Sequence, residues 1–147
     1  MKKFLLLIAV VVCASLSWQV QAGPAAQELG VCLTDSLTGK ERKNLAKWIF
    51  FAIAAHPEIS SYSKVSEANQ QQSDEFVGNL VTRLMADDCP QKSKNALQEG
   101  GSVAFEQAFG LVGQVAMQEL MADHKVLQTI SGYEKYLDQT RLRALSE

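Results

Sequence analysis

The pattern of apolar and polar residues changes in character after the first 22 positions. Lys2 and Lys3 precede an unbroken apolar run over residues 4–12, and the more polar stretch that follows closes on Val20-Gln21-Ala22. This three-part pattern is typical of a secretory signal peptide, and the apolar run is too short to span a membrane as a helix. We therefore predict that residues 1–22 are removed by cleavage near Ala22-Gly23, which makes the mature chain periplasmic or secreted.

Beyond this leader, apolar residues recur at the three- and four-residue spacing of helices, and no segment alternates as a β-strand does. Thr38 and Glu41 form a potential capping box, Pro57 stops the helix that follows, and Gly100-Gly101 interrupts the pattern again. The sequence predicts one all-α domain over residues 23–147, a compact bundle of five or six helices. The predicted helices cover residues 25–35, 39–55, 67–87, 90–100, 102–122 and 123–130, with a last short helix that ends near residue 145.

The helix predicted over residues 39–55 is apolar on all sides in its second half. A soluble protein buries such a segment among neighbouring helices, so we predict that this helix is central to the bundle. The apolar stripe on one side consists of Leu45, Trp48, Ile49, Ala52 and Ile53. The other side is filled by Phe50, Phe51, Ala54 and Ala55.

The helix predicted over residues 102–122 has the other wide apolar face. Gly110 and Gly113 interrupt it, although glycine is disfavoured in a helix interior. Their spacing of three residues places both on one side of the helix. We therefore predict a close approach there by a neighbouring helix or, in a homo-oligomer, by a second copy of the chain.

Charge and cysteine content narrow the class of protein. The leader carries two of the 14 basic residues and none of the 16 acidic ones, which leaves 12 basic and 16 acidic residues and a formal charge of −4. A mildly acidic domain argues against general binding of nucleic acid. Cys13 lies in the leader, so Cys32 and Cys89 remain, and in an exported protein such a pair predicts one interhelical disulfide. It would close a loop of about 58 residues and stabilise the fold by roughly 4 kcal/mol.

A cluster of cations at the start of the helix over residues 39–55 is the best candidate for a binding site. Positive side chains oppose the helix dipole at this end, so they need either compensation or a use. The cluster suits an anion such as a phosphate or an acidic patch of a partner, whereas the alternative is a solvated face paired with acidic residues of adjacent helices. Lys92 and Lys94 would enlarge the patch if the disulfide brings their helix close. The cluster consists of Lys40, Arg42, Lys43 and Lys47, with only Glu41 to offset it.

Other candidate chemistry is weaker. Met117, Met121 and His124 would share one face if their helix continues, and thioether and imidazole ligands suit copper(I), but methionine in an apolar helix ordinarily fills the core. His56 at a helix C-terminus is explained by the helix dipole. The sequence contains no hydrolase, metalloprotease or phosphate-loop motif, and we predict no cofactor.

The C-terminal part of the chain contains aromatic residues that share a face. Tyr133, Tyr136 and Leu137 either dock the last helix onto the body of the protein, which we favour, or form an exposed strip for a partner. Ser131 and Glu134 form a further potential capping box just before them.

Taken together, these features favour a small exported binding module that acts through protein–protein contact, and we expect its partner to be another envelope protein. An inhibitor or immunity protein for an exported toxin would be one such module. A ligand or copper carrier of the cell envelope and an enzyme are the alternatives, although no residue stands out as catalytic. The sequence leaves open whether residues 58–73 form a lid or only a connection.

Overall fold

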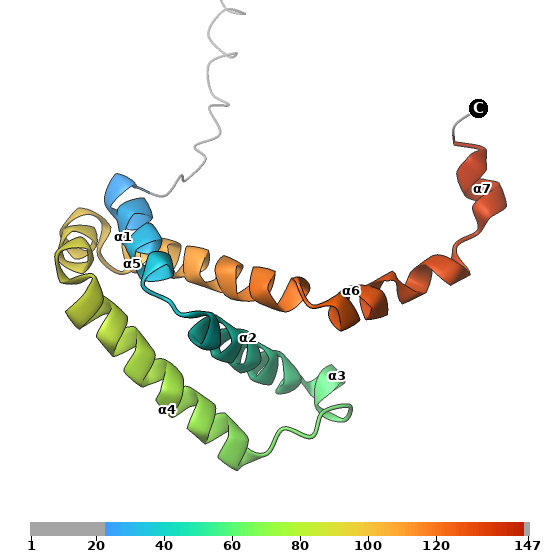
Figure 1. Cartoon of the computed structure of the whole chain (residues 1–147), viewed down its shortest axis with the longest axis horizontal. Coiled ribbons are helices and arrows are strands. Elements are labelled where there is room, and N and C mark those ends of the chain that lie inside the picture. Colours follow the sequence, from blue (N-terminus) through green and yellow to red (C-terminus); the bar gives the residue numbers. More distant parts are fainter. Residues whose placement is uncertain (1–22, 146–147) are drawn as a thin grey trace, which may run out of the picture.

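The computed structural model describes residues 23–145, so the predicted leader with its cleavage after Ala22 lies outside the described residues. The described residues are helical, and five of their seven α-helices have seven residues or more (Figure 1). The predicted all-α fold is confirmed. The elements are α1 (Pro24–Asp35), α2 (Gly39–Ala54), α3 (Pro57–Ser60), α4 (Glu67–Arg83), the π-helical η1 (Leu84–Asp88), α5 (Pro90–Met121), α6 (His124–Ile130), the 3₁₀-helical η2 (Ser131–Tyr136) and α7 (Gln139–Arg143).

Local sequence signals set most of the helix ends. The Thr38 N–H donates to the Glu41 carboxylate at 2.8 Å and the Glu41 N–H donates to Thr38 Oγ1 at 3.3 Å, so the predicted capping box begins α2. Ser66 and Asn69 form a second such box at the start of α4. Helix α2 ends before Pro57 as predicted, but this proline also occupies the first turn of α3. The predicted polar loop therefore begins with one helical turn.

The core lies where α1 packs against α5, while α2 packs against both α5 and α4 (Figure 1). Leu29 and Leu33 of α1 are fully buried. The two backbones come closest at Gly30, where a Cβ atom would lie 3.2 Å from the carbonyl oxygen of Ala108 and 2.5 Å from Cδ1 of Leu111. Glycine thus allows α1 to lie tightly on α5, and the buried residues of α5 are mostly small: Ser93, Ala96, Ala104, Ala108, Val112 and Ala116.

Two further features hold the bundle in shape. Helix α5 is broken at Gly101, whose φ of 57° and ψ of −136° are accessible to glycine and strained for other residues, so the predicted interruption is confirmed. The predicted disulfide also forms, with 6.1 Å between the Cα atoms of Cys32 and Cys89. It ties α1 to the start of α5, and Cys89 is buried.

The second half of α2 is not buried, which contradicts the prediction of a central helix enclosed on all sides. Phe50 and Ile53 are each 48% exposed, and Ala54 is the one residue of this half that is fully buried. Helix α2 packs against α4 and α5 and otherwise contacts the short helix α3, which leaves part of its second half uncovered by the described chain. No helix of the described chain approaches Gly110 or Gly113 closely, because no neighbouring atom lies within 4 Å of a Cβ built at either position, so the predicted approach by a neighbouring helix is wrong. The alternative, an approach by a second copy of the chain, stays a prediction.

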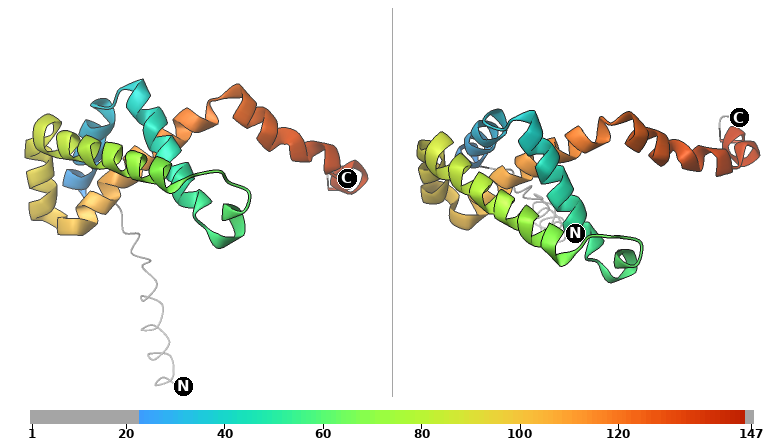
Figure 2. Two further views of the ribbon diagram at one scale, coloured as in Figure 1. Left: turned by 90° about the horizontal axis from the view of Figure 1, so that it is seen from below. Right: turned by 60° about the horizontal axis from the view of Figure 1, so that its bottom comes forward.

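Residues 124–145, which we call the C-terminal arm, extend away from the bundle (Figure 2). The arm contacts the rest of the protein at the junction between α5 and α6, and none of its helices contains a buried residue. The predicted docking of Tyr133, Tyr136 and Leu137 onto the body is therefore wrong, since Tyr136 is 81% exposed and the other two are also exposed. The predicted capping box at Ser131 is absent as well, because this residue continues directly from α6 into η2.

Candidate functional site

A surface groove with a volume of about 590 Å³ lies between α2 and the corner at which α5 meets α6. We call it the cationic groove. Its floor is apolar, and charged side chains surround the floor. The residues that line it are Lys43, Ala46, Lys47, Phe50, Glu119, Leu120, Asp123, Lys125 and Val126.

The corner between α5 and α6 builds one wall of this groove. Helix α5 ends at Met121, and the Asp123 carboxylate accepts from the N–H groups of Lys125 and Val126 at 2.8 and 3.2 Å. This cap starts α6 in a new direction. As a result, Val126 faces the same groove as Leu120. The opposite wall comes from α2, where Ala46 is buried and Phe50 remains half exposed.

The charges around the groove are unevenly paired. Glu119 accepts ion pairs from two residues of α2, with its carboxylate 3.5 Å from Arg42 Nε and 3.8 Å from Lys43 Nζ. Within the described part of the chain, Lys47 and Lys125 take part in no ion pair. Three lysines and two acidic residues line the groove, so it carries a small positive excess beside an apolar floor.

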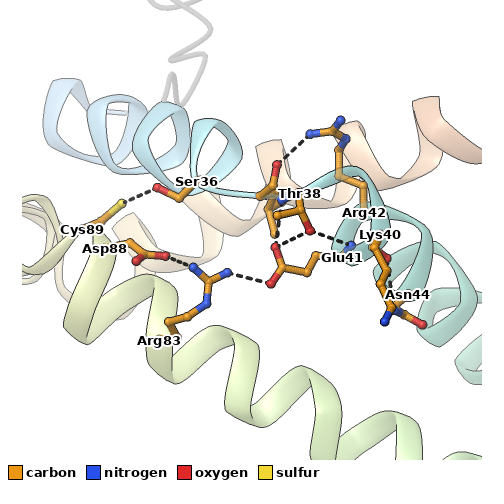
Figure 3. Close-up of polar contacts among 10 residues, drawn as sticks. Ser36, Thr38, Lys40, Glu41, Arg42, Asn44, Arg83, Asp88 and Cys89 are labelled. Carbon is orange, nitrogen blue, oxygen red and sulfur yellow. Dashed lines mark hydrogen bonds and ion pairs between the residues drawn. The ribbon is translucent and has the colours of Figure 1, made fainter.

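The residues of the predicted basic cluster therefore have different roles: one stabilises the fold, and others line the groove. Arg42 serves the fold, because its guanidinium also donates to the Leu37 carbonyl oxygen at 2.9 Å (Figure 3). Lys43 and Lys47 line the groove, and Lys40 is exposed but does not line it. The pairing of Arg42 and Lys43 with Glu119 agrees with the alternative of cations compensated by an adjacent helix.

Glu41 stands at the centre of a polar network that joins α2 to α4 (Figure 3). Arg83 donates to its carboxylate at 2.9 Å and also bonds Asp88. Burial raises the pKa of Glu41, but hydrogen bonds from the backbone and hydroxyl of Thr38, together with the charge of Arg83, outweigh this effect and hold the pKa below its ordinary value. This network compensates the positive start of α2 from within the fold.

The other predicted site residues lie apart from the groove. Lys92 pairs with Glu28 of α1 at 2.5 Å, and neither it nor Lys94 lines the groove. The hypothesis of a copper site required one helix through Met117, Met121 and His124, but α5 ends before His124. Among residues 23–145 no three His, Cys, Asp or Glu side chains form a group that could hold a metal ion.

Sequence reasoning missed the half of the groove that comes from α5 and α6. Glu119, Leu120, Lys125 and Val126 carry no local signal of their own, since they come together with α2 through the corner at Asp123. The available signal was the second half of α2, whose excess of apolar residues indicated that something must pack against it.

No family model matches the chain, and neither does any curated protein or solved structure. Between Gly23 and Leu145, no helix combines the length and hydropathy that a membrane span requires.

Proposed function

We propose that this protein is a small exported binding module of the cell envelope that acts through protein–protein contact, with the cationic groove as its binding surface. The observation that carries the proposal is the exposed second half of α2, with Phe50 at 48% exposure beside the groove. Large exposed apolar surfaces rimmed by polar residues mark interaction sites more often than unused surface. A protein partner would cover an area that the bundle leaves open.

The groove defines the chemistry of that partner. Its apolar floor fits one or two large aliphatic or aromatic side chains, because Ala46 leaves space between Phe50 and Leu120. Lys47 and Lys125 are available for carboxylates on either side of such an anchor. We therefore expect an acidic segment with a central apolar residue, whose charges steer the encounter and whose anchor supplies most of the affinity.

The leader pattern and the disulfide support an exported location. Disulfides persist in oxidising compartments such as the periplasm, and Cys32 and Cys89 lie at bonding distance. The three-part pattern of residues 1–22 independently favours export. An inhibitor or immunity protein for an exported toxin is one module of this kind.

Site-specific photo-crosslinking in the native host tests this proposal. A photoreactive amino acid at Phe50 should give one dominant adduct with an envelope protein, whereas the same amino acid at the exposed Gln98 should not. Lys43→Glu with Lys47→Glu should abolish that adduct. Lys64→Glu with Lys94→Glu changes the net charge equally at exposed lysines outside the groove, so the adduct should survive. An adduct that is equally strong in both double variants would refute binding at the groove.

A carrier of a small amphiphilic anion is the second candidate, because the groove volume of about 590 Å³ lies in the range of small-molecule sites. A native mass spectrum of the protein from the periplasm of its host separates the two functions. A bound mass of a few hundred daltons would favour a carrier. The bare mass of a chain that begins at Gly23, less two hydrogens, would favour a protein partner and confirm cleavage and the disulfide. A mass that begins at Met1 would refute export with cleavage.

A further inference from the structure

A second apolar cavity, which we call the inter-helix cleft, opens on the side of α2 away from the cationic groove. It has a volume of about 220 Å³ and lies between α2, α4 and α5. Because about 150 Å³ is enough to hold a benzene ring, the cleft has room for at least one large side chain. The residues that line it are apolar. The buried floor consists of Leu45, Leu80, Leu84, Val112 and Ala116, and the half-buried rim consists of Trp48, Ile49, Val77, Val81, Phe109 and Gly113.

Gly113 borders the open space of this cleft, because a Cβ atom there would meet no neighbouring atom within 4 Å. A hydrogen bond of 2.7 Å from Trp48 Nε1 to Asp74 Oδ1 links α2 and α4 near one end of the cleft. The acidic residues Glu67 and Glu75 lie on the same helix as Asp74 and are exposed. The cleft therefore offers an apolar slot beside a negatively charged helix.

The C-terminal arm has the complementary properties. Leu127, Ile130, Tyr133 and Tyr136 recur every three residues along α6 and η2, and all four are exposed. In a 3₁₀ helix, side chains three residues apart eclipse one another, so Tyr133 and Tyr136 of η2 lie one above the other. Leu127 and Ile130 of α6 are neighbours on the surface of an α-helix. Residues 124–147 carry four basic and three acidic side chains, whereas residues 23–123 carry eight basic and thirteen acidic ones. The C-terminal segment thus has a formal charge of +1, and the bundle that it joins has a formal charge of −5.

The geometry favours the cleft of another copy over the arm's own. Lys125 and Val126, at the root of the arm, line the cationic groove, and that groove and the cleft are formed by largely opposite faces of α2. To reach its own cleft, the arm would have to swing around α2 and give up the Asp123 cap that sets its direction. The arm extends away from its own bundle (Figure 2), so it is accessible to a second molecule without leaving that direction.

We propose that the protein associates with itself by arm exchange: the C-terminal arm of one copy packs across α2 and α4 of a second copy and inserts a large apolar side chain into its inter-helix cleft, and reciprocally. Two identical contacts of this kind close into a twofold dimer with no open end. Each copy contributes the 22 residues of its arm as well as its cleft, which meets the roughly 20–30 residues a side of a stable interface. Opposite charges on arm and bundle predict that high salt weakens the dimer.

Two glycine variants of the mature chain test the cleft by sedimentation velocity. Gly113→Leu places a side chain in the cleft, while Gly110→Leu adds the same side chain on the same helix at an exposed position outside it. Both changes favour the helix, so neither should unfold the protein. We expect the dimer dissociation constant to rise at least about tenfold for Gly113→Leu and to stay within about twofold for Gly110→Leu. A monomer at all concentrations, or equal effects of the two variants, would overturn the proposal.

Crosslinking between isotopically distinct chains tests the arm. A photoreactive amino acid at Ile130, in a mixture of ¹⁴N- and ¹⁵N-labelled protein, should give adducts of mixed isotope that join the arm to peptides of α2 or α4. Adducts within one isotope alone would mean that the arm folds back on its own bundle, which also overturns arm exchange. The proposal does not rest on the proposed partner site, because Gly113 lies outside the cationic groove and its variant leaves that groove unchanged.

Discussion

Removal of the Cys32–Cys89 disulfide should lower the free energy of unfolding by about 4 kcal/mol, chiefly through the unfolded chain. The bond joins residues 57 positions apart, so it closes a long loop that the unfolded chain would otherwise leave open. In the chain-entropy relation, a loop of this length restricts the unfolded chain by about 4 kcal/mol at 25 °C. This amount is a large share of the roughly 5–15 kcal/mol that stabilises a typical domain.

The native state should change little when the bond is removed. Leu29 and Leu33 remain buried between α1 and α5 whether or not the sulfur atoms are joined, and Gly30 keeps the two helices close. Alanine is the better replacement for Cys89, since a serine hydroxyl would be buried at a position that is 2% exposed. We therefore expect Cys32→Ala with Cys89→Ala to fold, with helical content like that of the wild type.

Urea unfolding followed by circular dichroism measures the effect. The double variant, and the wild type in excess reductant, should each lose about 4 kcal/mol, and the thermal midpoint should fall by roughly 15 °C. Agreement between the two samples separates the effect of the bond from the effect of the new side chains. A loss below about 1 kcal/mol, with the oxidised bond verified by mass, would refute the argument that the bond restricts the unfolded chain.

Three further predictions concern stability. Glu41→Gln should cost about 1 kcal/mol at pH 7. Because the pKa of Glu41 is lowered in the folded protein, its carboxylate stabilises the fold above the unfolded pKa, and this stabilisation is lost as the pH falls through the folded pKa. In urea titrations, the difference in unfolding free energy between wild type and variant should therefore shrink towards pH 3. A difference that stays constant with pH would contradict this reasoning. Gly30→Ala should be at least about 1 kcal/mol less stable than Gly78→Ala, whose new methyl group meets open space; equal stabilities would disprove the tight contact. Phe50→Ser should change the free energy of unfolding by less than about 0.5 kcal/mol, and a larger loss would show that Phe50 belongs to the core.

The parts of the fold that local chemistry determines could be predicted from the sequence. The capping box of Thr38 and Glu41, the stop at Pro57 and the break at Gly101 all depend on residues near one another in the chain. The disulfide was predictable for a different reason, since Cys32 and Cys89 are the two cysteines outside the predicted leader and have one possible pairing. Helix positions followed from periodicity, which requires no knowledge of neighbours.

Burial could not be predicted in the same way, because an apolar residue does not reveal what covers it. The second half of α2 was expected inside the bundle on the assumption that a partner helix exists within the chain. Gly110 and Gly113 indicated a close approach, whereas the glycine that α1 and α5 require is Gly30. At the candidate site, Lys43 and Lys47 could be identified from their charge. Arg42, however, forms an ion pair with Glu119, which lies 77 residues away in the sequence. Long-range contacts of this kind leave no local pattern.

The residues that stabilise the fold and the proposed binding surfaces occupy largely separate parts of this molecule. The contact between α1 and α5 fully buries Leu29 and Leu33, and the disulfide ties α1 to the start of α5. These two features therefore account for much of the free energy of folding. The outer face of α2, the rim of the inter-helix cleft and the C-terminal arm contribute apolar side chains that remain wholly or partly exposed. Burial of one large apolar side chain is worth about 1.5–3 kcal/mol, so these surfaces hold binding energy that folding leaves unused. Because that energy is not required for folding, substitutions there can alter association and leave the bundle intact.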